Sequence, residues 1–240
     1  MIQFNVLLEI IIAIILLAIS RELIALACHC GIKIQKGIGI ILVIVVLTIG
    51  ILFNPISIYV YIIALTVFIP IIFTEQSEVR DFLLGAIVLF VIVVIVGFTL
   101  NGLIFLIRRG ETDRLLYFYL SIVIRDTFSS IYGRFLPGRL ITQLSPNKTY
   151  QGALVGLIAV VILQLSLASK DGSSFRLALM EGITIGIIGQ IGDLTASAIK
   201  RSANVRHSGR IFGRRGGMID LFDSVIFTFP VWLGVISIFS

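Results

Sequence analysis

Long runs of apolar residues follow one another along most of this chain, with only short polar segments between them. The runs cover residues 4–20, 38–53, 56–73, 82–107, 115–133, 152–169, 177–199 and 225–239. Most come close to the roughly 20 residues that a helix needs to cross a bilayer. A spanning segment must satisfy its own backbone hydrogen bonds, which favours helices. We therefore predict an all-α, polytopic integral membrane protein with about eight to nine transmembrane helices.

The composition excludes the other common classes of protein of this length. Of the 240 residues, 58% are hydrophobic and only 13% are charged, whereas a soluble domain carries about 25% charged residues. Two cysteines are too few for a disulfide framework. The first run lacks a positively charged start and Glu9 interrupts it, so we interpret it as a retained segment rather than a signal peptide.

Two features shape the expected domain organisation. Asn54-Pro55 breaks the second run from the third. The run at 82–107 is weakened at Gly97 and at Asn101-Gly102, so it predicts either one tilted helix or a span followed by a short bent helix. We expect N-terminal transmembrane helices over residues 1–110 and a C-terminal catalytic transmembrane region with cytoplasmic loops over residues 111–240.

The basic residues predict the orientation. Two spans separate the loop at 134–151 from the loop at 200–224, so both loops lie on one side. Together they hold nine Lys and Arg residues, which places that side in the cytoplasm by the positive-inside rule. The segment at 108–114 conflicts with this, because its three arginines would lie outside. The net charge of +6 then reflects loop bias and anionic headgroups rather than nucleic acid, and we expect the cell (inner) membrane.

Asp193 is the strongest candidate functional residue, because an ionised side chain within a membrane helix is costly and usually has a role. Helical spacing places it on one stripe with two glycines, a hydroxyl and a cation, namely Gly186, Gly189, Ser197 and Lys200. The glycines let another helix approach closely. The alternative is a structural ion pair at the helix end between Asp193 and Lys200 or Arg201.

A second acidic pair, Asp220 and Asp223, opens the last span directly after Arg214-Arg215-Gly216-Gly217. Adjacent glycines permit tight turns and close ligand approach, and arginines beside exposed backbone N–H groups suit phosphate. Carboxylates near bound phosphate need a divalent cation between them, and Mg²⁺ takes both kinds of oxygen. The loop therefore predicts metal-assisted phosphate chemistry, although helix capping by the acids stays open.

The loop at 134–151 carries Ser145-Pro146-Asn147-Lys148-Thr149 just before an apolar helix. Ser145 or Thr149 is a suitable N-cap for that helix. Lys148 would then stand near a helix N-terminus, which is a second site for an anion. The alternative is capping alone. Gly152 and Gly156, four residues apart, are more typical of helix packing than of a ligand site, and a homodimer stays open.

Taken together, these segments resemble the signature of the phosphatidate cytidylyltransferases, also called CDP-diacylglycerol synthases. Residues 192–201, 208–209 and 216–224 follow the family's S-x-x-K-R, K-D-x-G and H-G-G-x-x-D-R-x-D pattern without a gap. Residues 145–149 resemble its S-P-x-K-T, and residues 126–134, which begin with Asp126, resemble its D-T-x-x-x-x-x-G-R. The resemblance extends from Asp126 to Ser224.

The resemblance implies an all-helical membrane enzyme that joins CTP and phosphatidate to give CDP-diacylglycerol and pyrophosphate. It also implies Mg²⁺ and a monovalent cation such as K⁺. Asp193 and Asp220 fall at the metal-binding positions, and Lys148, Lys200 and Arg201 at positions that contact phosphate and nucleotide. Asp126, Ser145, Thr149, Ser197, Asp223 and the four residues from Arg214 to Gly217 complete the expected substrate site.

The chain departs from the family pattern at seven positions, which are Ser130, Gln151, Ala196, Arg206, His207, Arg215 and Leu221. Two carboxylates are lost, and the local charge becomes more positive. These departures keep two alternatives open. One is an enzyme acting on another lipid phosphate or a CTP-dependent lipid kinase. The other is a non-catalytic membrane protein of the same fold that binds lipid.

Overall fold

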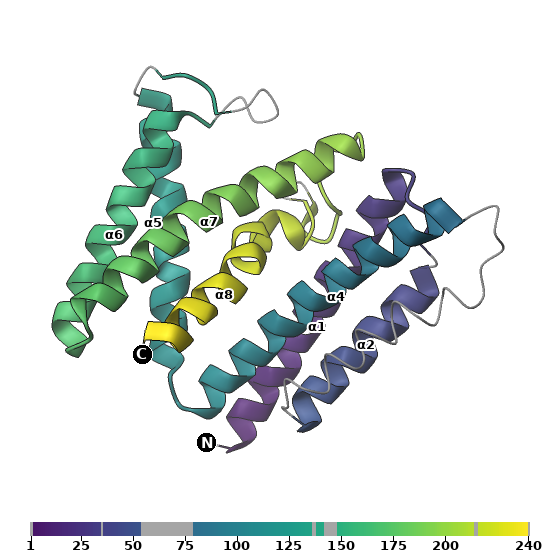
Figure 1. The fold of residues 1–240 in the computed structure, drawn as a ribbon, viewed down its shortest axis with the longest axis horizontal. Helices are drawn as coiled ribbons and strands as arrows, with labels where there is room; N and C mark the ends of the chain where they lie inside the picture. The colour runs from purple at the N-terminus through teal and green to yellow at the C-terminus, as the bar shows by residue number, and fades with distance from the viewer. Residues whose placement is uncertain are drawn as a thin grey trace. The chain divides into compact units, whose positions relative to one another are not determined.

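A computed structural model describes residues 2–34, 36–53, 79–135, 138–141, 148–213 and 216–239. The helices in these ranges are α1 (Ile2–His29), α2 (Lys36–Phe53), α4 (Val79–Arg108), α5 (Thr112–Phe135), α6 (Tyr150–Asp171), α7 (Phe175–Ser202) and α8 (Ile219–Phe239) (Figure 1). The only β pairing in the described ranges is an isolated antiparallel bridge between Leu140 and Thr149. The all-α prediction is confirmed.

The predicted number of spans is not confirmed. Among the described residues, 5 helices are long and apolar enough to cross a membrane, and they are α1, α4, α6, α7 and α8. In α2 the described apolar part is shorter, Gly39–Thr48, and the run at 56–73 lies outside the described residues. Helix α5 is not among the five because Arg125 and Asp126 interrupt its apolar sequence. The chain is a membrane protein with several apolar helices.

Three helix boundaries differ from the apolar runs. Helix α1 continues to His29, so that Glu22, which follows the apolar run at 4–20, is helical. Helix α4 is one continuous helix through Gly97, where the Asn101 side chain donates to the Gly97 carbonyl at 2.7 Å. Helix α8 begins at Ile219 instead of residue 225 and therefore includes Asp220 and Asp223.

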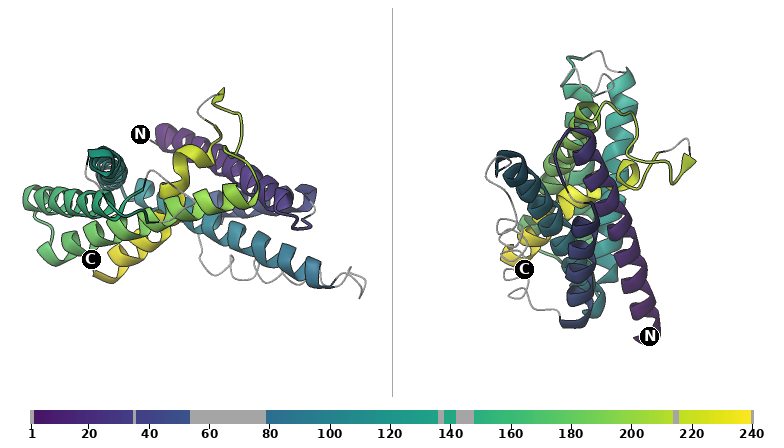
Figure 2. Two further views of the ribbon diagram at one scale, coloured as in Figure 1. Left: turned by 90° about the horizontal axis from the view of Figure 1, so that it is seen from above. Right: turned by 90° about the vertical axis from the view of Figure 1, so that its right-hand side faces the viewer.

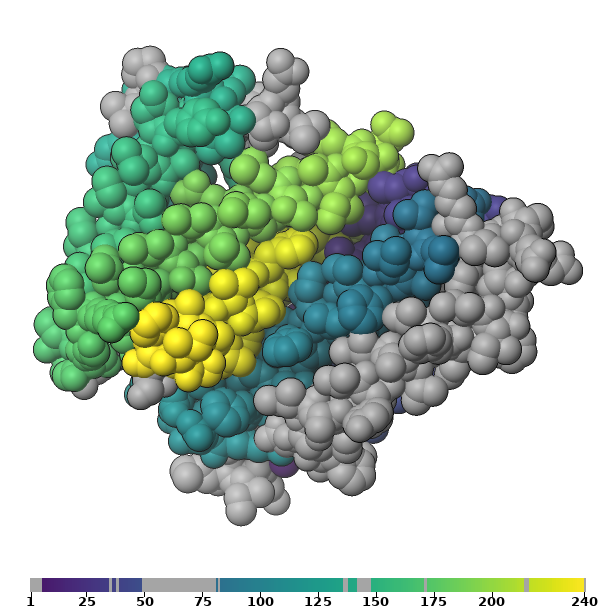
Figure 3. Space-filling model, in the orientation of Figure 1, coloured from purple at the N-terminus to yellow at the C-terminus, as the bar shows by residue number. Residues whose placement is uncertain are grey.

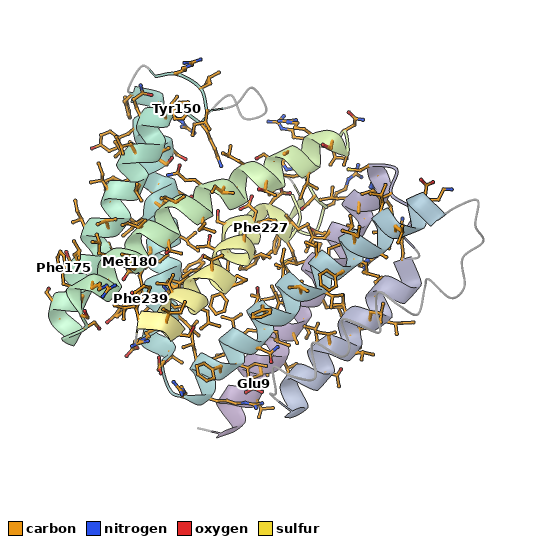
Figure 4. All side chains as sticks on the ribbon, in the orientation of Figure 1. Glu9, Tyr150, Phe175, Met180, Phe227 and Phe239 are labelled. Carbon is orange, nitrogen blue, oxygen red and sulfur yellow. The ribbon has the colours of Figure 1, made fainter. Side chains whose placement is uncertain are left out.

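The chain forms two compact units. Unit 1 contains Met1–Arg109 and Ile199–Leu221, and unit 2 contains Gly110–Ala198 and Phe222–Ser240. In unit 1, α1, α2 and α4 pack against one another (Figure 2). A bidentate ion pair links two of these helices, because Arg108 Nε and Nη2 donate to the two Glu9 carboxylate oxygens at 2.8 and 3.0 Å. The acid that interrupts the first apolar run is thus neutralised (Figure 4).

In unit 2, glycines set the distances between helices. Gly152 and Gly156 of α6 lie against the α5 backbone, and Gly182 of α7 lies against the Val161 backbone of α6. Gly192 of α7 faces Phe227 of α8. The helices α7 and α8 run side by side (Figures 3 and 4). The packing role predicted for Gly152 and Gly156 is confirmed, and the contact is made within one chain. Phe118, Phe229 and Trp232 form an aromatic core between α5 and α8.

The α5–α6 contact generates a stability prediction. A Cβ atom on Gly152 would lie 2.6 Å from the Ser129 carbonyl oxygen and 2.9 Å from the Gly133 Cα. Since both are backbone atoms, we expect Gly152→Ala to separate the helices and cost about 1–3 kcal/mol. Thermal unfolding in detergent would measure the loss as a lower Tm.

Gly234→Ala is the matched control, because it is also helical in unit 2 and a Cβ there meets nothing within 4 Å. Alanine at that position should leave the Tm unchanged or raise it slightly. Equal Tm values for the two variants would show that close approach of α5 and α6 does not need glycine.

Candidate active site

Asp193 of α7 lies at the centre of a polar cluster in unit 2, which we call the Asp193 cluster and define as Asp193, Lys148, Arg125, Asp126 and Ser224. Lys148 Nζ donates to Asp193 Oδ2 at 2.7 Å. The Ser224 hydroxyl donates to Asp193 Oδ1. The Asp193 side chain is 17% exposed, so these partners replace most of its hydration.

The loop before α6 positions Lys148. Its two arms pair through backbone hydrogen bonds, from Ile141 to the Lys148 carbonyl at 3.0 Å and from Tyr150 to the Arg139 carbonyl at 3.1 Å. Thr149 is the N-cap of α6, and its hydroxyl accepts from the Gly152 N–H at 3.1 Å. The predicted capping by Thr149 is confirmed, and it leaves the Lys148 side chain at the N-terminal end of the helix.

Arg125 is a site residue that sequence reasoning did not select. Its side chain is fully buried, and it donates to Asp126 Oδ1 from Nε at 2.9 Å and to the Ser224 hydroxyl from Nη2 at 2.8 Å. Nη2 also lies 3.7 Å from Asp193 Oδ2. The signal was present, because an arginine and an aspartate stand together within an apolar run.

Asp220 forms a second cluster in unit 1, which we call the Asp220 cluster and define as Asp220, Lys200, Ser208, Gly217 and Glu22. Lys200 Nζ lies 2.5 Å from Asp220 Oδ1. The sequence left open an ion pair between Lys200 and Asp193, but Lys200 contacts Asp220 instead. The backbone N–H groups of Ser208 and Gly217 donate to Asp220 Oδ2 at 2.9 and 3.0 Å. Asp220 is therefore held by both ends of the loop that precedes α8.

Glu22 of α1 supports the same loop, and sequence reasoning missed it. Its side chain is buried and accepts from the backbone N–H groups of Met218 and Ile219 at 2.9 and 3.0 Å. The Ser208 hydroxyl lies 2.7 Å from Glu22 Oε2 and 3.1 Å from Asp220 Oδ2, so it bridges the two carboxylates. A negative charge at these N–H groups suits the positive end of the α8 dipole.

The adjacent glycines make room for these two acids. Gly216 has φ +97°, and a Cβ there would overlap the Asp220 carboxylate. A Cβ on Gly217 would overlap the Glu22 carboxylate. The glycine pair was predicted to allow close approach of a ligand. In this structure the groups that approach it are the carboxylates of Asp220 and Glu22.

The remaining predicted site residues are placed as follows. Arg201 is exposed at the end of α7, and Ser197 and Asp223 are half-buried. The Asp223 carboxylate accepts from the Ser224 N–H at 2.7 Å. Of the positions that depart from the family pattern, Ala196 is buried and Ser130, Gln151, Arg206, His207 and Leu221 are exposed. Ser145, Arg214 and Arg215 lie outside the described residues.

Each of the two clusters contains one carboxylate at a family-motif position, which is the kind of ligand that a hard cation takes. Within the described ranges, no three His, Cys, Asp or Glu side chains converge as a cage for a metal ion. Mg²⁺ commonly uses one or two carboxylates and takes its other ligands from phosphate and water. Asp193 and Asp220 offer such carboxylates, and a flexible lysine amine now covers one oxygen of each. A lysine amine lies on a flexible four-carbon stem, so each of these contacts can be exchanged for another partner.

Comparison with known proteins adds independent evidence. The model of the cytidylyltransferase family matches residues 1–239. A phosphatidate cytidylyltransferase of Staphylococcus haemolyticus (strain JCSC1435) is 35% identical over 127 residues, which are 52% of this chain and 49% of that protein. The protein of the same name from Staphylococcus aureus (strain COL) is 31% identical over 168 residues, which are 68% of this chain and 64% of that protein. A third phosphatidate cytidylyltransferase, from Bacillus subtilis (strain 168), is 34% identical over 140 residues, which are 56% of this chain and 52% of that protein.

These matches span about half to two thirds of the length of the curated relatives. The family model, in contrast, covers nearly the whole chain, including the N-terminal helices that precede the motif resemblance from Asp126 to Ser224. On this evidence, the chain belongs to the cytidylyltransferase family.

Proposed function

We propose that this protein is a CTP-dependent cytidylyltransferase that converts phosphatidate and CTP to CDP-diacylglycerol and pyrophosphate in phospholipid biosynthesis. The observation that carries the proposal is the pairing of each family-motif aspartate with a lysine, Asp193 with Lys148 and Asp220 with Lys200. Such pairs hold a carboxylate for a metal and an ammonium for a phosphate in adjoining positions. The names of the curated relatives support the same activity.

The proposed reaction asks the protein for positioning and charge neutralisation. An oxygen of the lipid phosphate attacks the α-phosphorus of CTP, the bond from that phosphorus to the bridging oxygen breaks, and its electron pair leaves with pyrophosphate. The attacking phosphate is already ionised at neutral pH, so no general base is needed. Lys148, Lys200 and the exposed Arg201 bind phosphate oxygens, and orientation of the two substrates supplies much of the rate.

Mg²⁺ is the proposed metal, and Asp193 and Asp220 are the proposed metal-binding carboxylates. When bound, the ion would neutralise charge on phosphate oxygens and stabilise the leaving group. The rest of the proposed substrate site contains Asp126, Ser145, Thr149, Ser197, Asp223 and residues 214–217. Thr149 contributes by ending the loop at the N-terminus of α6, where backbone N–H groups favour an anion.

The proposed location is the cell membrane, with the site at its cytoplasmic border. Phosphatidate keeps its acyl chains in the bilayer while its headgroup meets water-soluble CTP, so the reaction needs basic groups at helix ends. Lys148 precedes α6, and Lys200 and Arg201 lie in the last turn of α7. Because α6 and α7 are consecutive spans, these ends face one side, and the positive-inside rule assigns it to the cytoplasm.

Pyrophosphate release by the purified full-length protein tests the proposal. We expect release from CTP that requires both phosphatidate and Mg²⁺, together with formation of CDP-diacylglycerol. A panel of other lipid phosphates and lipid alcohols measures specificity, since a lipid kinase would release CDP instead of pyrophosphate. Absence of turnover with every lipid, under conditions where the Bacillus subtilis relative is active, would overturn the proposal in favour of a binding protein.

Asp193→Asn tests the proposed metal-binding role. The substitution keeps the shape of the side chain and removes its charge, so we expect kcat to fall by more than about 100-fold. Asp81→Asn is the control for charge removal, because Asp81 is half-exposed and pairs with Lys33 at 3.2 Å outside both clusters. That variant should keep full activity. Wild-type kcat in Asp193→Asn would exclude the aspartate from the reaction.

Glu22→Gln tests whether the first helix organises the Asp220 cluster. The amide retains one acceptor, but its NH₂ group would meet backbone donors, so the loop before α8 should shift. We expect both a lower Tm, by the equivalent of about 1–3 kcal/mol, and a lower kcat. Glu22→Asp keeps the charge on a shorter side chain and should fall between the wild type and Glu22→Gln. A variant with wild-type Tm and kcat would show that the loop is held without Glu22.

A further inference from the structure

Arg125 is the fully buried cation of the Asp193 cluster. Its side chain is 0% exposed, although it lies on α5, the most polar of the helices in unit 2. Its guanidinium reaches three elements: Asp126 on its own helix, the Ile185 carbonyl of α7 at 3.3 Å, and Ser224 of α8. A guanidinium has five fixed donors, and this one directs them into the centre of the unit.

The neighbouring helices are shaped around this side chain. A Cβ on Gly189 of α7 would overlap Arg125 Nη1, and a Cβ on Gly156 of α6 would lie 3.4 Å from Arg125 Cγ. Gly189 was predicted to let a helix approach closely, but the structure shows that it makes room for a charged group. Gly189 therefore makes the compartment that the end of the Arg125 side chain fills, while Gly156 lies mainly against the Arg125 backbone.

The charges explain why a guanidinium is there. Asp126 and Asp193 both contact the guanidinium, and the Asp193 side chain is only 17% exposed, whereas that of Asp126 is 44% exposed. A carboxylate as enclosed as Asp193 is strongly disfavoured without a cation. Lys148 also contacts Asp193, but it lies on a loop, its side chain is 28% exposed, and the proposed reaction draws it toward phosphate. Arg125 has no comparable freedom. It is the cation that remains when Lys148 moves.

We propose that Arg125 is a built-in cation, whose guanidinium occupies the space between Asp126, Asp193 and Ser224 where a bound monovalent cation would otherwise be needed. This inference deepens the proposed function and rests on it for its catalytic consequence. Arg125 is a positioning residue, because it acts through Asp193 and does not itself reach the exposed loops. The K⁺ ion implied by the family resemblance would have to share this space with the guanidinium, whose nitrogen atoms donate to Asp126 and Ser224 and lie 3.7 Å from Asp193 Oδ2.

The first test compares ions on the wild-type protein. Pyrophosphate release is measured in KCl, NaCl and choline chloride at equal ionic strength and constant Mg²⁺. The expected result is the same kcat in all three salts, because the fixed cation makes an exchangeable one unnecessary. Loss of activity in choline chloride that K⁺ restores would overturn the proposal.

The second test is chemical rescue of Arg125→Ala in the full-length protein. We expect this variant to have a lower Tm than the wild type and a kcat reduced by about 100-fold, because Asp126 and Asp193 lose the guanidinium between them. Millimolar guanidinium should raise the Tm of the variant and increase its kcat by at least about tenfold. Urea has the same shape without charge and should do neither. Arg176→Ala, which removes an exposed arginine stacked on Phe239 in the same unit, should not respond to guanidinium.

The two readouts separate this inference from the proposed function. If the wild type shows no turnover, the transferase proposal fails, but the Tm of Arg125→Ala with guanidinium against urea still tests the built-in cation. Equal Tm values with guanidinium and urea would overturn it. Should Arg125→Ala not fold, Arg125→Gln takes its place, because it removes the charge and keeps a polar side chain, and we then expect a kcat that rises with added K⁺. A kcat independent of K⁺ in that variant, with kcat well below the wild type, would assign Arg125 a purely steric role.

Discussion

A carboxylate enclosed by apolar helices needs a cation or a set of hydrogen-bond donors, and much of this structure is arranged to supply them. Glu9 is paired with Arg108, Asp193 with Lys148 and Arg125, and Asp220 with Lys200. Removing either member of such a pair leaves an uncompensated charge that costs more than the pair contributes. The acids therefore specify which helices must meet and at which level.

Two kinds of cation meet this need, and they have different consequences. Arginine at positions 108 and 125 makes several directed hydrogen bonds from a planar group, and both arginines hold helices together. Lysine at positions 148 and 200 makes a single contact from a flexible stem. The motif aspartates keep a mobile partner, which suits a site where phosphate and metal exchange with the chain's own charges.

Much of this organisation was predictable from the sequence, but the pairings were not. The helices follow from apolar length, the cap at Thr149 follows from residue type, and Asp193 and Asp220 stand out because charge is rare in such segments. Glu22 was missed because the polar residues around it resembled the end of a span, whereas α1 continues to His29. Arg125 was missed because helical periodicity says nothing about its partners on α7 and α8.

The contact between Glu22 and the start of α8 joins residues that are 197 positions apart in the chain. During synthesis, α1 enters the bilayer long before the N–H groups that its glutamate accepts have been made. The Asp220 loop therefore acquires its shape only after the first residues of α8 have been made. A nascent or truncated chain would carry Glu22 and Lys200 without this arrangement. Closure of the loop thus depends on synthesis having passed the start of α8, almost 200 residues after the glutamate that holds it.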